Sequence, residues 1–190
     1  MGEALCLAKA MQALFGSEIG VFFDTGTDAE EVLGRKRTLV DAAVPAGNSV
    51  AALVLLQLAV MTGDRSLEEA GEAVLRASTQ QMNKYPTGSA QLLNALDFAL
   101  GPRRVMVLAG DPATPRAKAM LQPLRQRFLP RTLVLWRRPE DTALDELAPV
   151  VRGKLPLDDG VTAYLCQEQT CLEPARSPEQ LAALLDAPAV

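Results

Sequence analysis

Residues 101–112, GPRRVMVLAGDP, mark the point at which the chain changes its hydrophobic period. The run Val105–Ala109 is short and apolar and is bounded by two arginines and a Gly-Asp-Pro turn, as expected of a buried strand. Upstream, the apolar residues repeat at the spacing of helices. The sequence therefore predicts an α+β protein with a boundary near Gly101-Pro102, helical over residues 1–101 and with a small α/β element and C-terminal tail over residues 102–190.

Four helices are predicted upstream of this boundary, over residues 3–15, 49–62, about 66–82 and about 89–100. The second is apolar almost all round, and such a helix must be covered on every side. Ser66 with Glu69 has the pattern of a capping box that opens the third helix. Helices joined in this way by turns are typical of an array of α-hairpins.

Downstream, strands alternate with helices. Strands are predicted at residues 105–109, 132–136 and 161–165, with helices opening at Thr114-Pro115, near Asp141 and at Ser177-Pro178. The first of these helices is expected to bury one apolar face, made of Ala117, Met120, Leu121, Leu124 and Phe128. Because β-α-β units carry parallel strands, we expect a small three-stranded parallel β-α-β-α-β layer.

The composition excludes several catalytic classes. With 48% hydrophobic and 22% charged residues the chain is globular, but it contains no histidine. That removes Ser-His-Asp and Cys-His nucleophiles, histidine acid–base chemistry and histidine-containing zinc sites. No apolar run reaches the roughly 18 residues of a membrane span. The N-terminus lacks a basic signal region, and three cysteines fit a reducing compartment, so we expect a cytoplasmic protein with no membrane partner.

The net charge of −4 is distributed unevenly. Residues 1–100 carry 7 basic and 12 acidic side chains, residues 101–155 carry 11 and 5, and residues 156–190 carry 1 and 6. A basic segment between acidic flanks can be a nucleic-acid patch. Here the arginines are scattered through a strand–helix pattern without interleaved aromatic residues. We therefore expect the three segments to compensate one another's charge, and no nucleic-acid partner.

The long connection between the first two predicted helices is the best candidate for a site, because connectors of this length are often functional. Its candidate cleft-lining residues are Asp24, Arg35, Lys36, Asp41, Asn48 and Ser49. Paired carboxylates can perform general acid–base work on a sugar, and basic side chains can orient an anionic group. The structural alternative is that the carboxylates cap turns or pair with arginine, and that Asn48 or Ser49 is only a helix N-cap.

Two other motifs carry weaker signals. Gly110-Asp111-Pro112 lies between a strand and a helix, but it has one glycine where a dinucleotide fingerprint needs three, so we interpret it as a simple turn. Cys166 and Cys171 are five residues apart, which allows a loop-closing disulfide but is not a C-x-x-C redox spacing. They form either a structural or a redox pair. No metal site and no cofactor are predicted.

Several ordered motifs resemble one family. They are Phe22-Phe23-Asp24-Thr25, Arg35-Lys36, DAAVPAGNSVAA at residues 41–52, Leu58-Ala59-x-x-Thr62-Gly63, Tyr85-Pro86-x-Gly88 and Ala163-Tyr164-x-Cys166-x-x-x-x-Cys171-x-x-Pro174. Together they resemble the C-terminal part of the thioredoxin-domain-containing, spermatogenesis-associated-type protein family, over nearly the whole chain. Val21 and Ala46 depart from the family pattern, which favours glycine and serine there, and Ala46 thus removes a hydroxyl from the loop.

The resemblance implies a fold larger than this chain. Family members are similar to a thioredoxin-like domain followed by an (α/α)6 toroid like that of six-hairpin glycosidases, with a small α/β element. The chain would then be a partial (α/α) toroid without the thioredoxin-like part. Two functions follow: a structural or interaction role, with self-association or the missing portion as partner, or one wall of a site for a carbohydrate ligand. The aromatic content of 4% offers few stacking platforms for a sugar and favours the first.

Overall fold

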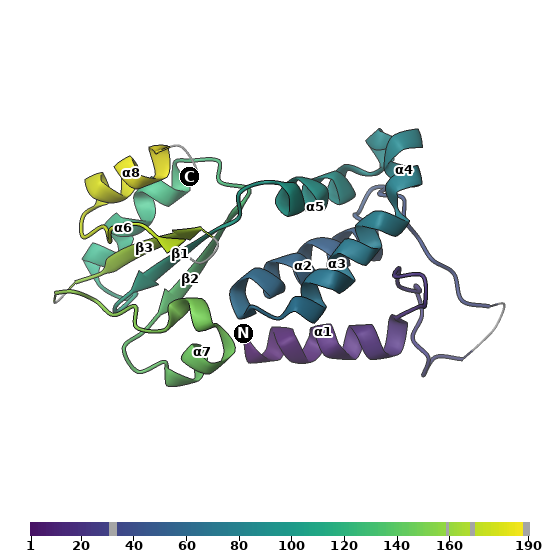
Figure 1. Ribbon diagram of the computed structural model, residues 1–190, viewed down its shortest axis with the longest axis horizontal. Coiled ribbons are helices and arrows are strands. Elements are labelled where there is room, and N and C mark those ends of the chain that lie inside the picture. The colour runs from purple at the N-terminus through teal and green to yellow at the C-terminus, as the bar shows by residue number, and fades with distance from the viewer. Residues whose placement is uncertain (31–33, 159, 168–169, 188–190) are drawn as a thin grey trace. The chain divides into compact units, whose positions relative to one another are not determined.

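A computed structural model describes residues 1–30, 34–158, 160–167 and 170–187 of the chain (Figure 1). The chain divides into two compact units, Met1–Leu100 and Gly101–Val190. Within the described residues the fold is α+β, with eight α-helices and one four-stranded sheet. No helix of these ranges is long and apolar enough to cross a membrane.

The first unit is helical. Its elements are α1 (Gly2–Phe15), α2 (Gly47–Thr62), α3 (Arg65–Ala77), α4 (Thr79–Lys84), the 3-10 turn η1 (Pro86–Gly88) and α5 (Ala90–Leu100). The apolar helix α2 packs against both α3 and α5. Leu55 and Leu56 of α2 are completely buried, and Phe98 of α5 is 1% exposed. Burial of these side chains is the main source of stability for this unit.

A glycine allows α3 to approach α2 closely. A Cβ atom on Gly71 would lie 2.8 Å from Cγ of Leu56 and 3.1 Å from the carbonyl oxygen of Ala52. Any larger residue would push the two helices apart, because a contact with backbone cannot be relieved by a side-chain rotation. Leu67, Val74 and Leu75 fill the rest of the α3 face and are buried.

The prediction of one continuous helix over residues 66–82 is wrong, because the structure has two helices there. α3 ends at Ala77, and α4 begins at Thr79. The hydroxyl of Thr79 donates to the carbonyl oxygens of Leu75 and Arg76. Threonine hydroxyls compete in this way with the backbone donors of a continuous helix, which accounts for a break that apolar periodicity does not reveal.

The predicted capping box at Ser66 and Glu69 is wrong by two residues. The N-cap of α3 is Asp64, whose Oδ1 accepts from the N–H of Ser66 at 2.9 Å and from its hydroxyl at 2.7 Å. Glu69 instead pairs with Arg65 at 3.0 Å. An aspartate at this position also suits the positive end of the helix dipole.

The second unit is a sheet covered by helices. Its elements are β1 (Arg104–Ala109), α6 (Pro115–Arg125), β2 (Thr132–Arg137), α7 (Thr142–Leu147), the 3-10 turn η2 (Pro149–Val151), β3 (Thr162–Gln167), β4 (Thr170–Cys171) and α8 (Pro178–Asp186). The strand order is β2-β1-β3-β4. Met106 and Leu108 of β1 share a buried core with residues of α6 and α8, among them Met120 and Leu181 (Figure 1).

The prediction of an all-parallel layer is wrong, because among the strands that the structure describes only β1 and β2 run parallel. β3 pairs antiparallel with β1, and β4 pairs antiparallel with β3. Ala109, at the end of β1, lies opposite both Arg137, where β2 ends, and Thr162, where β3 begins. The connection from β2 to β3 therefore starts and finishes at the same end of the sheet. Its helix α7 has only six residues and does not return the chain to the other end.

The predicted helix starts in this unit are confirmed. The hydroxyl of Thr114 accepts from the N–H of Ala117 at 3.1 Å, and that of Ser177 accepts from the N–H of Gln180 at 3.3 Å. A proline follows each cap. Phe128, however, is 91% exposed, because α6 ends at Arg125 and its buried face ends with it.

Ion pairs join the basic segment to the acidic tail, as the charge distribution suggests. Arg127 donates from Nε and Nη2 to both carboxylate oxygens of Asp186 at 2.7 Å, and Nη2 of Arg116 lies 3.2 Å from Asp158. The hydrogen bonds from Arg127 lower the pKa of Asp186. The arginines named here therefore bind carboxylates of their own chain.

We predict that Asp64→Ala lowers the free energy of unfolding by about 1 kcal/mol at pH 7, because it removes an N-cap. Hydrogen bonds from the Ser66 hydroxyl and amide lower the pKa of Asp64 in the folded protein. The cap therefore contributes fully above the unfolded-state pKa of about 4 and is lost as the pH falls through the folded-state pKa. Urea denaturation at pH 7 and pH 3 should show the difference between the two proteins shrinking in acid. A Ser66→Ala cost larger than that of Asp64→Ala would contradict this cap.

Candidate functional site

The candidate loop is attached to the C-terminal end of α1 by backbone hydrogen bonds. The N–H of Phe23 donates to the carbonyl oxygen of Phe15 at 2.8 Å, and the N–H of Thr27 donates to that of Leu14 at 2.9 Å. Helix ends leave such carbonyl groups without intrahelical partners. The loop therefore satisfies the end of α1, and this attachment fixes where its side chains lie.

Arg35 braces this attachment. Its Nη2 donates to the carbonyl oxygens of Leu14 at 2.9 Å and Thr25 at 2.7 Å, and its Nε donates to Thr25 at 3.1 Å. The guanidinium carbons of Arg35 and Arg37 lie 4.0 and 4.1 Å from the centroid of the Phe23 ring. Arg35 thus uses Nε and Nη2 on carbonyl groups of the loop and of α1, whereas the adjacent Lys36 is exposed.

Asp24 holds two parts of the loop together. Its Oδ1 accepts from the N–H of Thr38 at 3.0 Å, and its Oδ2 accepts from the hydroxyl of Thr38 at 2.7 Å. The N–H of Asp24 also donates to the carbonyl oxygen of Lys36 at 2.8 Å. Each carboxylate oxygen therefore already has one donor, although an ionised carboxylate can accept about four hydrogen bonds.

Asp41 links the starts of two helices. Its Oδ1 accepts from the N–H of Ala46, the N-cap residue of α2, at 2.9 Å, and its Oδ2 accepts from the N–H of Gln91 in the first turn of α5 at 2.8 Å. The N–H of Asp41 donates to the carbonyl oxygen of Gly88 at 2.8 Å. The negative charge thus lies at the positive ends of two helix dipoles, where it is stabilising.

Asn48 and Ser49 lie in the first turn of α2 and are buried. The Nδ2 of Asn48 donates to the carbonyl oxygens of Phe22 at 2.9 Å and Thr38 at 3.0 Å, while its Oδ1 accepts from the N–H of Phe22 at 2.6 Å. Asn48 is 2% exposed, so these bonds replace the hydrogen bonds to water that the side chain loses on burial. The hydroxyl of Ser49 is buried and has no hydrogen-bond partner among the described residues.

Two of the six candidates line a cavity of about 330 Å³, namely Asp24 and Asn48. The other lining residues are Met11, Phe15, Phe22, Phe23, Gly47 and Ala51. Among the residues that the structure describes, this lining does not include Arg35, Lys36, Asp41 or Ser49. Sequence reasoning missed the aromatic lining, although three of the five phenylalanines of the chain lie between positions 15 and 23.

The arrangement favours the structural alternative for both carboxylates. Acid–base work on a sugar needs two carboxyl groups that face one substrate. Only Asp24 lines the cavity, while Asp41 is bound to the backbone N–H groups that begin two helices. Both aspartates therefore make hydrogen bonds that hold the fold together, and Asp24 in addition borders the cavity.

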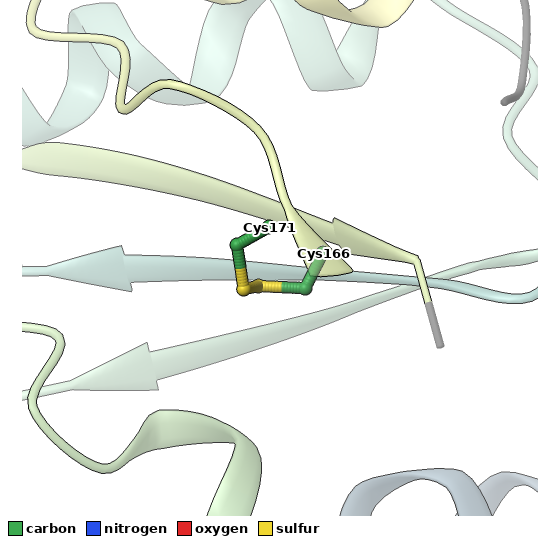
Figure 2. The surroundings of a disulfide bond; sticks show 2 residues. All are labelled: Cys166 and Cys171. Atoms are coloured by element: carbon green, nitrogen blue, oxygen red, sulfur yellow. A yellow bond between two sulfur atoms is a disulfide. The ribbon is translucent and has the colours of Figure 1, made fainter. Parts of the chain in front are cut away.

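Cys166 and Cys171 form a disulfide (Figure 2). They lie opposite each other where β4 pairs with β3; Cys166 is buried and Cys171 is exposed. The bond joins the two-residue edge strand to the sheet. The free Cys6 is exposed on α1. No group of three or more His, Cys, Asp or Glu side chains that could hold a metal occurs in the described parts of the chain.

We predict that Asn48→Ala lowers the free energy of unfolding by roughly 3 kcal/mol, because it leaves buried backbone groups of Phe22 without partners. Ser49→Ala is the matched control on the same helical turn. It removes a hydroxyl without a described partner, so it should change the unfolding free energy by less than about 0.5 kcal/mol or stabilise the protein. Urea denaturation measures both. Equal costs for the two variants would contradict this assignment.

Comparison with known proteins finds relatives that the chain matches over part of their length. No family model matches it. Over 146 residues, 76% of the chain, it is 29% identical to spermatogenesis-associated protein 20 of Homo sapiens, and over the same length it is 28% and 27% identical to the proteins of that name from Rattus norvegicus and Mus musculus. The chain spans about a fifth of the length of these curated relatives, 18–19%. The chain is therefore distantly homologous to part of spermatogenesis-associated protein 20.

Proposed function

We propose that the chain has a structural and interaction role, in which its helical unit is a segment of an incomplete (α/α)6 toroid. The occupant of its open helix face would be further helical hairpins of the same kind. The limited span of the alignment supports this proposal, since the relatives contain about four fifths of their length outside the matched region. The helices around α2 supply the physical reason.

The observation that carries the proposal is an exposed apolar strip on α2. Val50 and Val54 are one helical turn apart and are 41% and 39% exposed, although α2 packs against α3 and α5 on other faces. The sequence of α2 contains no charged residue. A helix that is apolar all round is stable only when it is covered all round, so the strip favours packing against another apolar helix.

The hydrogen bonds of the loop agree with a role without catalysis. Asp41 accepts from the N–H of Ala46 at the start of α2, and Asn48 of α2 donates to the carbonyl oxygen of Phe22 in the loop. Arg35 uses Nε and Nη2 on carbonyl groups near the end of α1. These side chains hold the helices in the positions that present the strip. None of them requires a substrate to be satisfied.

A second candidate function is one wall of a carbohydrate site, and the cavity beside α2 favours it. Phe15, Phe22 and Phe23 gather there despite the low aromatic content of the chain, and aromatic rings are platforms for the apolar faces of sugars. Asp24 supplies a hydrogen-bond acceptor at the same cavity. Further hairpins would have to complete such a site.

We predict that the chain self-associates through the α2 strip when no other helix covers it. Light scattering across a dilution series should show a concentration-dependent dimer or larger species. The double variant Val50→Glu/Val54→Glu should be monomeric throughout, because two carboxylates cannot be buried in an apolar contact without a large desolvation cost.

The matched control is Phe128→Glu, which places a carboxylate at an exposed apolar side chain of the other unit. It should leave the association unchanged. A chain that stays monomeric at every concentration, or an association that Phe128→Glu abolishes and Val50→Glu/Val54→Glu does not, would contradict the proposed role of α2. Far-UV circular dichroism confirms that each variant is folded.

A further inference from the structure

The cavity beside α2 is large enough for a small ligand by itself. Its volume is about 330 Å³, and it is an open hollow bordered by α1, the loop around Phe23 and the first turns of α2. An apolar cavity of about 150 Å³ can already bind benzene. This cavity therefore has room for one ring with a short substituent.

Most of its lining is apolar. Met11 and Phe15 come from α1, Phe22 and Phe23 from the loop, and Ala51 from α2. None of these side chains offers a strong hydrogen-bond donor or acceptor. A polar group of a ligand that lay against this lining would lose its water without gaining a partner. The body of the ligand must therefore be apolar.

The polar groups at the cavity leave acceptor positions and one kind of donor. Asn48 makes hydrogen bonds with both Nδ2 and Oδ1 to the backbone of Phe22 and Thr38, so it has no donor hydrogen left and keeps one acceptor position on Oδ1. Asp24 accepts one bond on each oxygen and retains acceptor positions. At Gly47, α2 begins, and N–H groups of a first helical turn lack intrahelical partners.

The charges around the cavity are mixed. The carboxylate of Asp24 is negative, while the start of α2 is the positive end of a helix dipole and two guanidinium groups lie 4.0 and 4.1 Å from the centre of the Phe23 ring. An ammonium group of a ligand would be attracted by Asp24 and repelled by the helix start and the guanidinium groups. A carboxylate would be repelled by Asp24 and attracted by the positive groups. A neutral hydroxyl, which both donates and accepts, matches the two kinds of partner.

We propose that this cavity binds a small neutral ring that carries one hydroxyl group, of which phenol is the simplest example. The ring lies against the phenylalanines and Met11, and the hydroxyl donates to Asp24 and accepts from the N–H groups that begin α2. This site goes beyond both functions proposed above. It differs from a carbohydrate site because a sugar would place several hydroxyl groups against the apolar lining.

The test is a titration of the full chain with phenol, toluene, benzoate and glucose, followed by NMR chemical shifts of the backbone amides. Phenol should bind saturably at millimolar concentration and shift the amides of Gly47 and Asn48, while toluene and benzoate should bind at least several-fold more weakly. Absence of saturable phenol binding, or toluene binding as tightly as phenol, would overturn the proposal. Tighter binding of glucose than of phenol would also overturn it, while supporting the carbohydrate candidate.

Variants separate the hydroxyl contact from the space for the ring. Asp24→Asn can keep both bonds to Thr38, since its Oδ1 can accept from the N–H and its Nδ2 can donate to the hydroxyl. This variant should weaken the binding of phenol several-fold and leave the affinity for toluene unchanged. Ala51→Leu fills the cavity and should abolish the binding of both phenol and toluene. Ser49→Ala, on the same helix but outside the lining, should change neither affinity. If Ala51→Leu fails to fold, an unchanged phenol affinity in Asp24→Asn overturns the proposal alone.

Discussion

The carboxylate of Asp41 is the link on which the arrangement of the helical unit depends, because it binds the beginnings of two helices that are far apart in sequence. It accepts from Ala46 at the start of α2 and from Gln91 at the start of α5. The residue at the N-cap of α2 is an alanine, which has no side-chain acceptor of its own. A residue from the loop therefore supplies the cap, and in doing so fixes the position of α5 against α2.

With these helix starts fixed, the burial of α2 determines the rest of the unit. Gly71 lets α3 approach it, and Leu55 and Leu56 are removed from water between the surrounding helices. The same helix leaves Val50 and Val54 exposed at its remaining face. An apolar helix gains by burying every face, so a unit that buries only some of them is physically suited to receive one more helix.

Local signals in the sequence predicted most helix and strand positions, although they misplaced the N-cap of α3 and missed the break between α3 and α4. Features that depend on distant residues were predicted poorly. The N-caps at Thr114 and Ser177 and the apolar strand at Val105–Ala109 depend on neighbouring residues, and the structure confirms them. The direction of β3 depends on where the long connection before it ends, which no short pattern encodes. The cavity could not be predicted from short sequence patterns either, because it combines side chains from α1, the loop and α2. Only Asp24 and Asn48 among its lining residues stood out by their chemistry.

The residue types that suggested catalysis in the loop are also those that an irregular segment needs for its own stability. Backbone groups outside helices and strands must find partners, and Asp, Asn and Arg side chains can provide them. A count of used and unused hydrogen-bonding positions separates the two roles. Asn48 has used both donor hydrogens on backbone carbonyl groups, so it has no donor to offer a ligand. Asp24 binds Thr38 with one hydrogen bond on each oxygen and still has acceptor positions at the cavity, so it is the lining side chain with the most acceptor capacity for a ligand.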